Sequence, residues 1–497
     1  MQTNDIIKLT FPNNHEYSAM VLQFVREIAG SIGFGSNSLN QIDIAIEESV
    51  SNVMEHTMDE ENPTFDVICK KIEGGIQITL KEMGIPFDPE KVKHYELSKD
   101  SDGRSTSGLG MYLIEKVMDE VKYINLGPKG KETIMIKYLP GSVPVDSQEN
   151  SYIAPAEPKA ISEKIEYDIR GMMENEAIEI SRCAYKTHGY TFFDDHIYYP
   201  ERLVKMIRTL QMISAVAVTK DNTFMGHAAF LYQHPEDVIA EFTFVFVNVE
   251  YRGQGALNRL VDYLFTVPKT RELRGIYAYA VTNHLFTQKS MVKSGINDCG
   301  ILLATSPNSW KFKGFSDDSG QRISVVLSFK YMTPPKKQTL YVPAHHKDMI
   351  EKLYRNIGAG HTFIIQENAG TAFTRPDAVL DSEVNELESC AEITIFEYGE
   401  DVVRQVRLLV RKFCVSQVAA IQLFIRLDDP LTCLLTAEFE KIGFFFAGIM
   451  PESRTGDVLI LQYLNNVELD YDKIHILTDL ARELSAYIKK YDPNIIP

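Results

Sequence analysis

Three polar side chains recur on one side of a predicted helix in the stretch IAIEESVSNVMEHT (44–57). Glu48, Asn52 and His56 are spaced at i, i+4 and i+8, so they share a face that borders the apolar one. A carboxylate can take a proton from an attacking hydroxyl, and an amide oxygen can hold Mg²⁺. The stripe therefore indicates phosphoryl-transfer chemistry, and the alternative is an ordinary solvated helix face.

Two glycine-rich turns each open a predicted helix. One is GLG at 108–110, and the other is RGQG at 252–255. Backbone N–H groups and the positive end of a helix dipole converge at such a turn, which suits an anion. We expect phosphate groups at both turns. For GLG, the alternative is a simple helix cap.

The polar stripe of Glu48, Asn52 and His56 would be positioned by a helix that packs on a sheet. A helix over 38–57 would bury the face made of Ile42, Ala45, Ile46, Ser49 and Val53. A second helix is expected over 108–121. Alternating apolar residues predict strands at 64–72, 75–83, 121–126 and 132–139. The two helices would bring the stripe and GLG to the same sheet.

Together these residues resemble the nucleotide boxes of the GHKL-type ATPases, and among them the bacterial anti-sigma serine kinases. The resemblance covers residues 1–140 and implies an α/β sandwich that binds ATP and Mg²⁺. EESVSNVMEH is similar to the first box. In that box Glu48 would be the catalytic base and Asn52 the metal ligand.

The second and third boxes follow in the family's order. EMGIPFDP (82–89) is similar to the second, where Gly84 would let the backbone approach the nucleotide. Glu82 stands where the family usually carries Asp to hold the adenine amino group, and its additional methylene displaces the carboxylate. GRSTSGLGMYLIEKVMDEV is similar to the third box. It would place Gly108, Leu109 and Gly110 at the phosphates.

The same resemblance implies a protein partner. Sensor histidine kinases share these boxes but precede them with a helical hairpin that carries a phosphoacceptor His, and only about 37 residues precede the first box helix here. This favours a serine/threonine kinase that acts on an anti-sigma antagonist or sequesters a sigma factor. The alternative is a binding domain that has lost transfer.

A second resemblance covers 161–333. The apolar strand, short turn and helix of 239–265 resemble the acyl-CoA loop of the GNAT acetyltransferases. The resemblance makes Glu241 a candidate catalytic base, although a lone Glu in a strand is more often structural. It also implies that the pyrophosphate of acetyl-CoA would be bound by Arg252, Gly253, Gln254 and Gly255.

Two positions depart from the GNAT pattern. Leu257 replaces the last Gly or Ala of the loop and could crowd a phosphate. Met291 occupies the position where many members carry a tyrosine acid, and a thioether cannot donate a proton. The fold is therefore the firmer expectation, and acyl transfer is a hypothesis.

The last domain reads as a diverged copy of the middle one. KSGINDCGI (293–301) and KIGFFFAGI (441–449) carry Lys, two Gly and Ile at the same offsets, and a strand follows each. Chance is the alternative, because Lys-x-Gly is a common helix cap. In place of the Arg252 loop, this copy offers Glu400 and Asp401, which would repel phosphate. We expect a structural or partner-binding lobe.

Length and composition agree with this division. A chain of 497 residues suits about three domains at roughly 150 residues each. The stretch 141–160, rich in Pro, Ser and acidic residues, predicts a linker. The predicted fold class is α+β multidomain, with a GHKL-type α/β sandwich at 1–140 followed by GNAT-like α/β lobes at 161–333 and 335–497.

Charge and cysteine usage limit the partners. A net charge of −17 argues against direct binding to nucleic acid, and no apolar run is long enough to span a membrane. The six cysteines lie far apart without metal-ligand spacing, which favours a reduced, cytoplasmic protein. Near the C-terminus an apolar helical stripe indicates a core face or, alternatively, a homodimer seam. It consists of Ile474, Leu477, Leu480, Leu484 and Ile488.

Three functional hypotheses follow. The preferred one is a regulatory serine/threonine kinase that binds ATP and Mg²⁺ and is fused to a GNAT-like domain for acetyl-CoA. The second is an N-acetyltransferase, acting on an unidentified acyl acceptor, that the ATP-binding domain regulates. The third is a non-enzymatic protein whose nucleotide shapes a surface for its partner.

Overall fold

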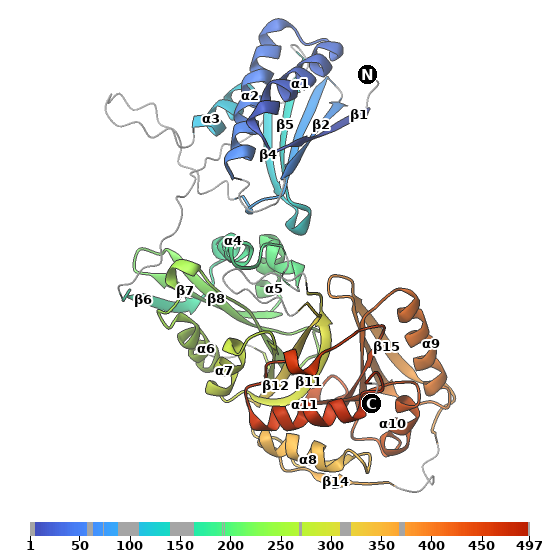
Figure 1. Ribbon diagram of the computed structural model, residues 1–497. Coiled ribbons are helices and arrows are strands. Elements are labelled where there is room, and N and C mark those ends of the chain that lie inside the picture. The colour runs from blue at the N-terminus through green and yellow to red at the C-terminus, as the bar shows by residue number, and fades with distance from the viewer. Residues whose placement is uncertain are drawn as a thin grey trace.

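A computed structural model describes most of the chain. The described residues are 5–56, 63–72, 74–87, 109–139, 164–190, 192, 194–267, 271–308, 320–366 and 373–495, without the side chains of residues 55, 56 and 109. An N-terminal domain stands at one end of a larger body that contains both later lobes (Figure 1). Among these residues, no helix has an apolar stretch of the length needed to cross a bilayer.

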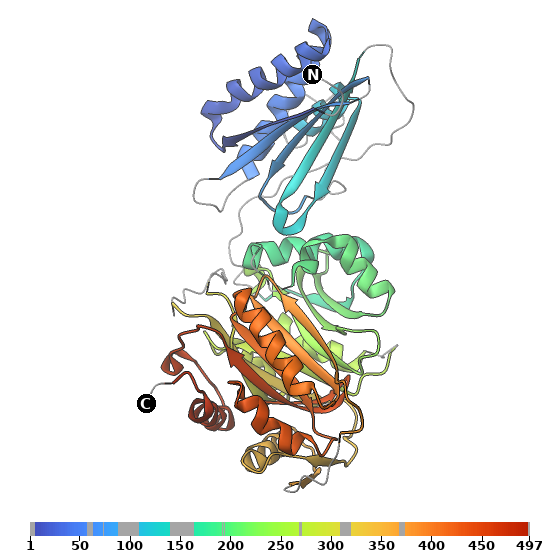
Figure 2. The same cartoon turned by 90° about the vertical axis from the view of Figure 1, so that its right-hand side faces the viewer.

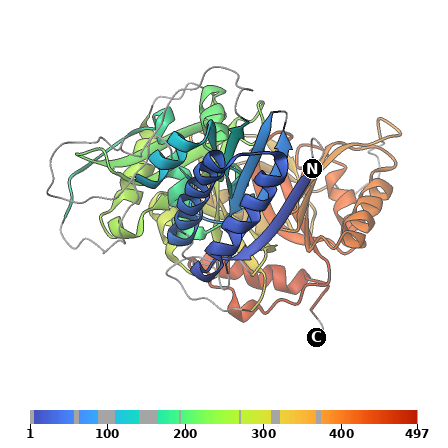
Figure 3. The same cartoon turned by 90° about the horizontal axis from the view of Figure 1, so that it is seen from above.

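The N-terminal domain is a layer of helices on an antiparallel sheet. Its strands, in the spatial order β1-β2-β3-β5-β4, are β1 (Ile6–Pro12), β2 (Thr64–Ile72), β3 (Gly75–Glu82), β5 (Lys131–Tyr138) and β4 (Glu120–Asn125). The helices are α1 (Ser18–Ile32), α2 (Ser36–His56) and α3 (Leu109–Val117). Figure 2 shows α1 and α2 on one face of the sheet, and from above they lie side by side on the outer side of the domain (Figure 3). This is the sandwich expected from the sequence.

Helix α2 is oriented by its apolar face. The five residues predicted to face the sheet, Ile42, Ala45, Ile46, Ser49 and Val53, are all buried. Glu48 and Asn52 lie at the edge of that face and are half-buried. The burial of the apolar face thus fixes the direction in which the polar stripe points.

The first lobe of the larger body begins with β6 (Tyr167–Gly171) and contains the glycine turn of 252–255. Its helices are α4 (Ala177–His188), α5 (Pro200–Arg208), α6 (Ala256–Thr266) and α7 (Phe286–Lys293). Its further strands are β7 (Met212–Thr219), β8 (Phe224–Leu231), β9 (Ile239–Val247), β10 (Gly275–Val281), β11 (Asn297–Ser306) and β12 (Ile323–Tyr331). The right-handed βαβ unit β9-α6-β10 carries the candidate acyl-CoA loop.

The second lobe repeats the end of the first. Its strands are β13 (Thr339–Tyr341), β14 (Thr362–Ile364), β15 (Val379–Asn385), β16 (Cys390–Glu397), β17 (Ala420–Arg426), β18 (Phe445–Ser453) and β19 (Gly456–Leu464). Its helices are α8 (Lys347–Asn356), α9 (Val402–Val415), α10 (Thr432–Glu440) and α11 (Asp479–Tyr491). The strand order β16-β17-β19-β18 matches β9-β10-β12-β11 of the first lobe, and α9 takes the place of α6.

The two lobes share one sheet of 12 strands, because β11 pairs with β18. The pairing is at Gly300 and Gly448, which are the corresponding glycines of the two sequence repeats. A Cβ atom on Gly448 would collide with the backbone of Gly300, so the approach requires glycine. The shared glycine of the repeat is therefore the contact between its two copies.

This junction gives the first testable prediction. Replacing Gly448 with alanine should lower the free energy of unfolding by between about 1 and 3 kcal/mol, because the added methyl group must push two strands apart. Thermal unfolding measures the loss. Gly30→Ala is the matched control, since a Cβ there meets nothing within 4 Å. An unchanged melting temperature for Gly448→Ala would contradict the close contact.

The C-terminal apolar stripe belongs to the core rather than to an exposed seam. Leu484 and Ile488 of α11 are fully buried and pack in the large cluster that spans both lobes. The helix begins at Asp479, so Ile474 and Leu477 of the predicted stripe precede it. The predicted linker at 141–160 lies outside the described residues, and the domain boundaries stay predictions.

Candidate functional site

The first site forms where α2 meets the start of α3. Gly110 lies so close to α2 that a Cβ atom on it would overlap the Glu48 carboxylate. The same position is 3.8 Å from Oδ1 of Asn52. The structure therefore brings together three of the residues that the sequence singled out. Gly108 and the side chains of Leu109 and His56 lie outside the described residues.

The second box lies at the end of β3. Glu82 is 8% exposed, and its Oε1 is 3.4 Å from Nζ of Lys131 on β5. An adenine amino group would therefore share this carboxylate with Lys131. Farther along, the Asn125 side chain accepts from the N–H of Phe87 at 2.7 Å and donates to its carbonyl at 2.8 Å. These bonds hold the backbone that follows Gly84.

The neighbouring lobe reaches this box. The hydroxyl of Tyr190, which follows α4, donates to the carbonyl of Gly84 at 2.6 Å. The hydroxyl of Tyr199, which precedes α5, donates to the carbonyl of Leu126 at 2.9 Å. The candidate nucleotide site therefore shares a hydrogen-bonded contact with the first lobe of the larger body.

The second site is a gap between two parallel strands. β9 pairs with β10 only over Ile239–Glu241, although both strands continue well beyond that point. A pocket of about 270 Å³ lies along the rest of β9. It is lined by Thr187, His188, Phe242, Val245, Phe246, Val247, Arg252, Leu257, His284, Phe286, Thr287, Ser290 and Met291. Strands that separate in this way leave backbone N–H and C=O groups without ladder partners, and these groups can bind an extended ligand.

A β-bulge at Phe244 changes the direction of the β9 backbone beside the pocket. Phe244 has a φ of 53°, and the register with β8 shifts there. His227 of β8 holds the bulge, because its Nδ1 is 2.7 Å from the Phe244 carbonyl and its Nε2 is 2.7 Å from Oγ of Ser214. Burial lowers the pKa of His227 to about 4, so the ring is neutral at pH 7.

The glycine turn closes one end of the gap. Gly253 and Gly255 have φ values of 85° and 79°, which glycine adopts readily and which direct successive N–H groups to one side. The side chain of Gln254 accepts a hydrogen bond from the N–H of Ile165 at 3.2 Å. Because its side-chain oxygen is already bonded, we expect Gln254 to contact a phosphate through its backbone N–H group. Arg252 and Leu257 both line the pocket, and crowding of a phosphate by Leu257 stays a prediction.

Glu241 lies where the two strands part and is 5% exposed. Its Oε2 accepts a hydrogen bond from Nε2 of Gln233 at 2.8 Å. Burial first, and then the negative charges of Asp194 and Glu388, raise the pKa of Glu241 to about 8. A carboxylate with this pKa is a strong general base once it has lost its proton.

The pocket contains titratable groups that the sequence analysis missed. His188 ends α4 and His284 precedes α7, and each lines the pocket beside the buried Met291. Each is a lone histidine without motif spacing. Only the fold, which brings α4 and α7 to opposite sides of β9, reveals them.

The corresponding strands of the second lobe stay paired for longer, because β16 and β17 pair over Cys390–Thr394. At the start of α9, Asp401 accepts hydrogen bonds from the N–H of Ala378 and from Nε2 of Gln405, each at 2.8 Å. A carboxylate therefore occupies the end of the helix where the first lobe offers Gly255. Because such a carboxylate would repel a phosphate, the absence of CoA from the second copy stays a prediction.

One carboxylate of the second lobe nevertheless faces the first. Glu392 pairs with Gln422 in the register that pairs Glu241 with Tyr277. Part of its side chain is exposed, yet the surrounding protein desolvates the carboxylate and raises the pKa of Glu392 to about 7. Burial, and then the charges of Glu241 and Glu392 among others, raise the pKa of the Tyr277 hydroxyl. The charges of the two glutamates, one from each lobe, thus both act on Tyr277.

Known proteins resemble two parts of the chain. Serine-protein kinases RsbW from Bacillus thuringiensis and Bacillus anthracis are each 27% identical over 143 residues, which is 28% of this chain and 88% of theirs. Spermidine/spermine N-acetyltransferase SpeG from Vibrio cholerae, at 17% identity and a TM-score of 0.26, covers 33% of this chain and 94% of its own. A GNAT-family acetyltransferase from Desulfovibrio desulfuricans, at 12% identity and a TM-score of 0.27, covers 34% of this chain and 100% of its own.

The sequence family that matches is the Histidine kinase-like ATPase domain, over residues 11–137. This range contains β2, β3, β4 and all but the last residue of β5, together with the site at Glu48, Asn52 and Gly110. Residues 11–137 therefore form a histidine kinase-like ATPase domain that is similar to the serine-protein kinases RsbW.

Proposed function

We propose that the N-terminal domain binds ATP with Mg²⁺ and phosphorylates a serine or threonine of a protein partner. The observation that carries this proposal is the contact of Gly110 with Glu48 and Asn52 inside the matched ATPase domain. The donor set suits the ligand, because an amide oxygen and a carboxylate border a helix N-terminus whose close approach only glycine permits.

Each residue has a distinct role in this reaction. Asn52 would hold Mg²⁺ through Oδ1, and the N–H groups at the start of α3 would bind phosphate. Bound Mg²⁺-ATP supplies the phosphoryl group and neutralises its charge. Glu48 accepts the proton of the partner's hydroxyl while that oxygen bonds to phosphorus and the bond to ADP breaks. Lys131 would hold the Glu82 carboxylate in place beside the nucleotide through their ion pair.

The partner follows from the resemblance of the domain. RsbW is named a serine-protein kinase, and the anti-sigma kinases that the sequence resembles act on an antagonist protein and sequester a sigma factor. We assign the same kinds of partner to this chain. The third hypothesis, partner binding without transfer, requires the same nucleotide site. It differs only in giving Glu48 no catalytic role.

Replacing Glu48 with glutamine tests the proposal. The variant keeps the size of the side chain but cannot take up the proton, so phosphoryl transfer should fall by about 10²-fold or more. Transfer is measured as label moved from γ-labelled ATP to serine or threonine in the protein extract of the source cells. ATP affinity, measured separately, should stay within a few fold. Equal transfer by the variant and the wild type would remove Glu48 as the base, and binding without any transfer by the wild type would favour the third hypothesis.

A specific observation favours a second activity, N-acetyl transfer by the first lobe. The gap between β9 and β10 ends at Glu241, and the turn with Gly253 and Gly255 borders the same pocket. In the reaction, the acceptor nitrogen bonds to the acetyl carbonyl carbon and loses a proton to Glu241. The carbon–sulfur bond breaks, and the CoA sulfur takes up a proton from solvent.

The carboxylates near Glu241 support a cationic amine as the acyl acceptor. The pKa of the Tyr279 hydroxyl is raised mainly by burial. Negative charges from both lobes raise it further, and they belong to Glu392, Glu241 and Glu388. A positive charge bound there would be neutralised by groups that otherwise repel one another. The second lobe would then contribute to acceptor binding without binding CoA.

A further inference from the structure

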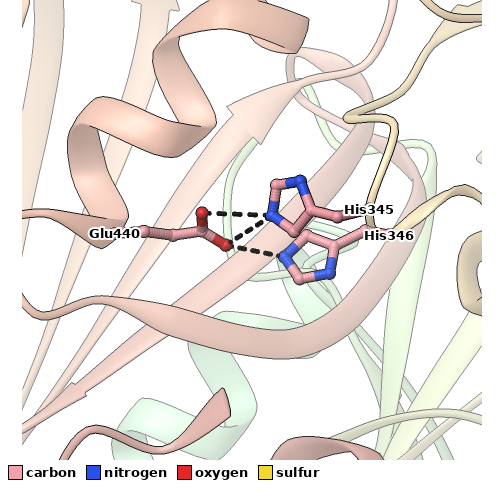
Figure 4. A group of neighbouring side chains, drawn as sticks. All are labelled: His345, His346 and Glu440. Carbon is pink, nitrogen blue, oxygen red and sulfur yellow. Dashed lines mark hydrogen bonds and ion pairs between the residues drawn. The ribbon is translucent and has the colours of Figure 1, made fainter.

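A cluster of two histidines and one glutamate lies in the second lobe, away from both candidate sites. His345 and His346 precede α8, and Glu440 is the last residue of α10 (Figure 4). Nε2 of His345 is 2.9 Å and 3.1 Å from the two Glu440 oxygens, and Nε2 of His346 is 2.8 Å from Oε1. Three potential metal ligands thus point at one place.

The hydrogen bonds around His346 fix where its proton lies. The hydroxyl of Tyr487 donates to the carbonyl of His345 at 2.9 Å. It has no second proton, so at its 2.8 Å contact with Nδ1 of His346 it must accept. Nδ1 therefore carries the proton of the neutral ring, and Nε2 presents a lone pair.

That lone pair faces a carboxylate. Glu440 is partly buried, and each of its carboxylate oxygens lies within hydrogen-bond distance of an imidazole nitrogen, at 2.9 Å and 3.1 Å from His345 and 2.8 Å from His346. His346 is 0% exposed, so its ring meets this carboxylate in the interior of the lobe. A bare nitrogen and a carboxylate oxygen at hydrogen-bond distance repel unless a cation lies between them.

We propose that Nε2 of His345, Nε2 of His346 and a carboxylate oxygen of Glu440 bind a zinc ion. Two imidazoles and a carboxylate are ligands of Zn²⁺, whereas Mg²⁺ and Ca²⁺ prefer oxygen alone. Zinc–ligand bonds of about 2.0–2.2 Å require the ligand atoms to lie slightly farther apart than they do here. A movement of a few tenths of an ångström is within reach of the half-exposed His345 side chain.

The surroundings suit such an ion. Tyr487 of α11 fixes the tautomer and orientation of His346, which is the usual role of a hydrogen-bonding partner behind a metal-bound histidine. The fourth position faces the solvent beside His345, so a water molecule completes the tetrahedron. The ion joins the chain before α8 to the end of α10, and through Tyr487 to α11. Its effect is to stabilise the second lobe.

Zinc titration of the full-length, chelator-treated protein tests the site. Calorimetry should give one Zn²⁺ per chain with a dissociation constant below about 1 μM, and the melting temperature should rise at saturating metal. Mg²⁺ should produce neither effect. His346→Gln and Glu440→Gln should each weaken zinc binding by about 100-fold or more. His475→Gln and Glu438→Gln are matched controls, because His475 is exposed and Glu438 is partly exposed in the same lobe, and neither change should alter zinc binding.

A milder variant protects the test against misfolding. Tyr487→Phe keeps all three ligands but removes the group that fixes His346, and zinc affinity should fall by about 10-fold to 100-fold. No zinc binding, together with nuclear magnetic resonance signals from protons on both ring nitrogens of His346 at pH 7, would overturn the proposal and identify a buried imidazolium–carboxylate pair. Zinc binding that survives His346→Gln unchanged would also overturn it.

Discussion

Asn52→Ala is expected to reduce the affinity for Mg²⁺-ATP by at least about 10-fold to 100-fold. Asn52 lies at the edge of the buried face of α2, with Oδ1 close to Gly110, and the methyl group of alanine leaves no ligand for the metal. The phosphates would keep their contacts with the start of α3 but lose the ion that bridges them. Calorimetric titration of Mg²⁺-ATP into both proteins measures the difference.

The control for this experiment lies in the same helix. Asn37→Ala changes an exposed asparagine in the first turn of α2 and should leave Mg²⁺-ATP affinity unaltered. Repeating the titration without Mg²⁺ should bring the wild type down to the level of Asn52→Ala. If the wild type itself does not bind ATP, the kinase proposal fails, and the domain with Glu82 in its second box is a degenerate one.

Glu241→Gln should lower the rate of acetyl transfer to an amine by about 10²-fold to 10⁴-fold, which is the range for loss of a general base. The wild-type rate should also depend on pH in a defined direction. Because the pKa of Glu241 is raised to about 8, the residue is mostly protonated at pH 7 and unable to accept a proton. The kcat/KM should therefore rise by about tenfold per pH unit below pH 8 and level off above it.

Two comparisons isolate this effect. Glu166→Gln changes an exposed glutamate before β6 and should preserve both the rate and the pH profile. Acetyl-CoA affinity should be similar in Glu241→Gln and the wild type, since the carboxylate lies at the end of the gap rather than at the glycine turn. A flat pH profile with undiminished transfer in the variant would exclude Glu241 as the base.

Local periodicity was sufficient to predict the helices and strands that position both sites. The predicted strand 64–72 and β2 have the same bounds, and every residue expected on the buried face of α2 is buried. The order and spacing of the family motifs alone predicted a site made of Glu48, Asn52 and Gly110. The structure places these residues close to one another. Each of these inferences depends on residues that are close in sequence or on a known order of motifs.

Contacts between distant segments could not be predicted in this way. The ion pair of Lys131 with Glu82 depends on the register of β3 and β5. His346 and Glu440 are 94 residues apart, and neither belongs to a recognisable spacing. Likewise, His188 and His284 line the same pocket only because the fold brings α4 and α7 to β9. Such groupings are products of the tertiary fold.

The paired glycines Gly300 and Gly448 give the two lobes the geometry of a symmetric dimer within one polypeptide. Equivalent residues meet across a pseudo-two-fold axis, as in an isologous subunit interface. A true dimer of this kind must carry identical copies and dissociates on dilution. A covalent pair is free of both restrictions. One half could therefore keep a strand gap and a glycine turn while the other carries Asp401 and a longer strand pairing. The assembly is equally complete at any protein concentration.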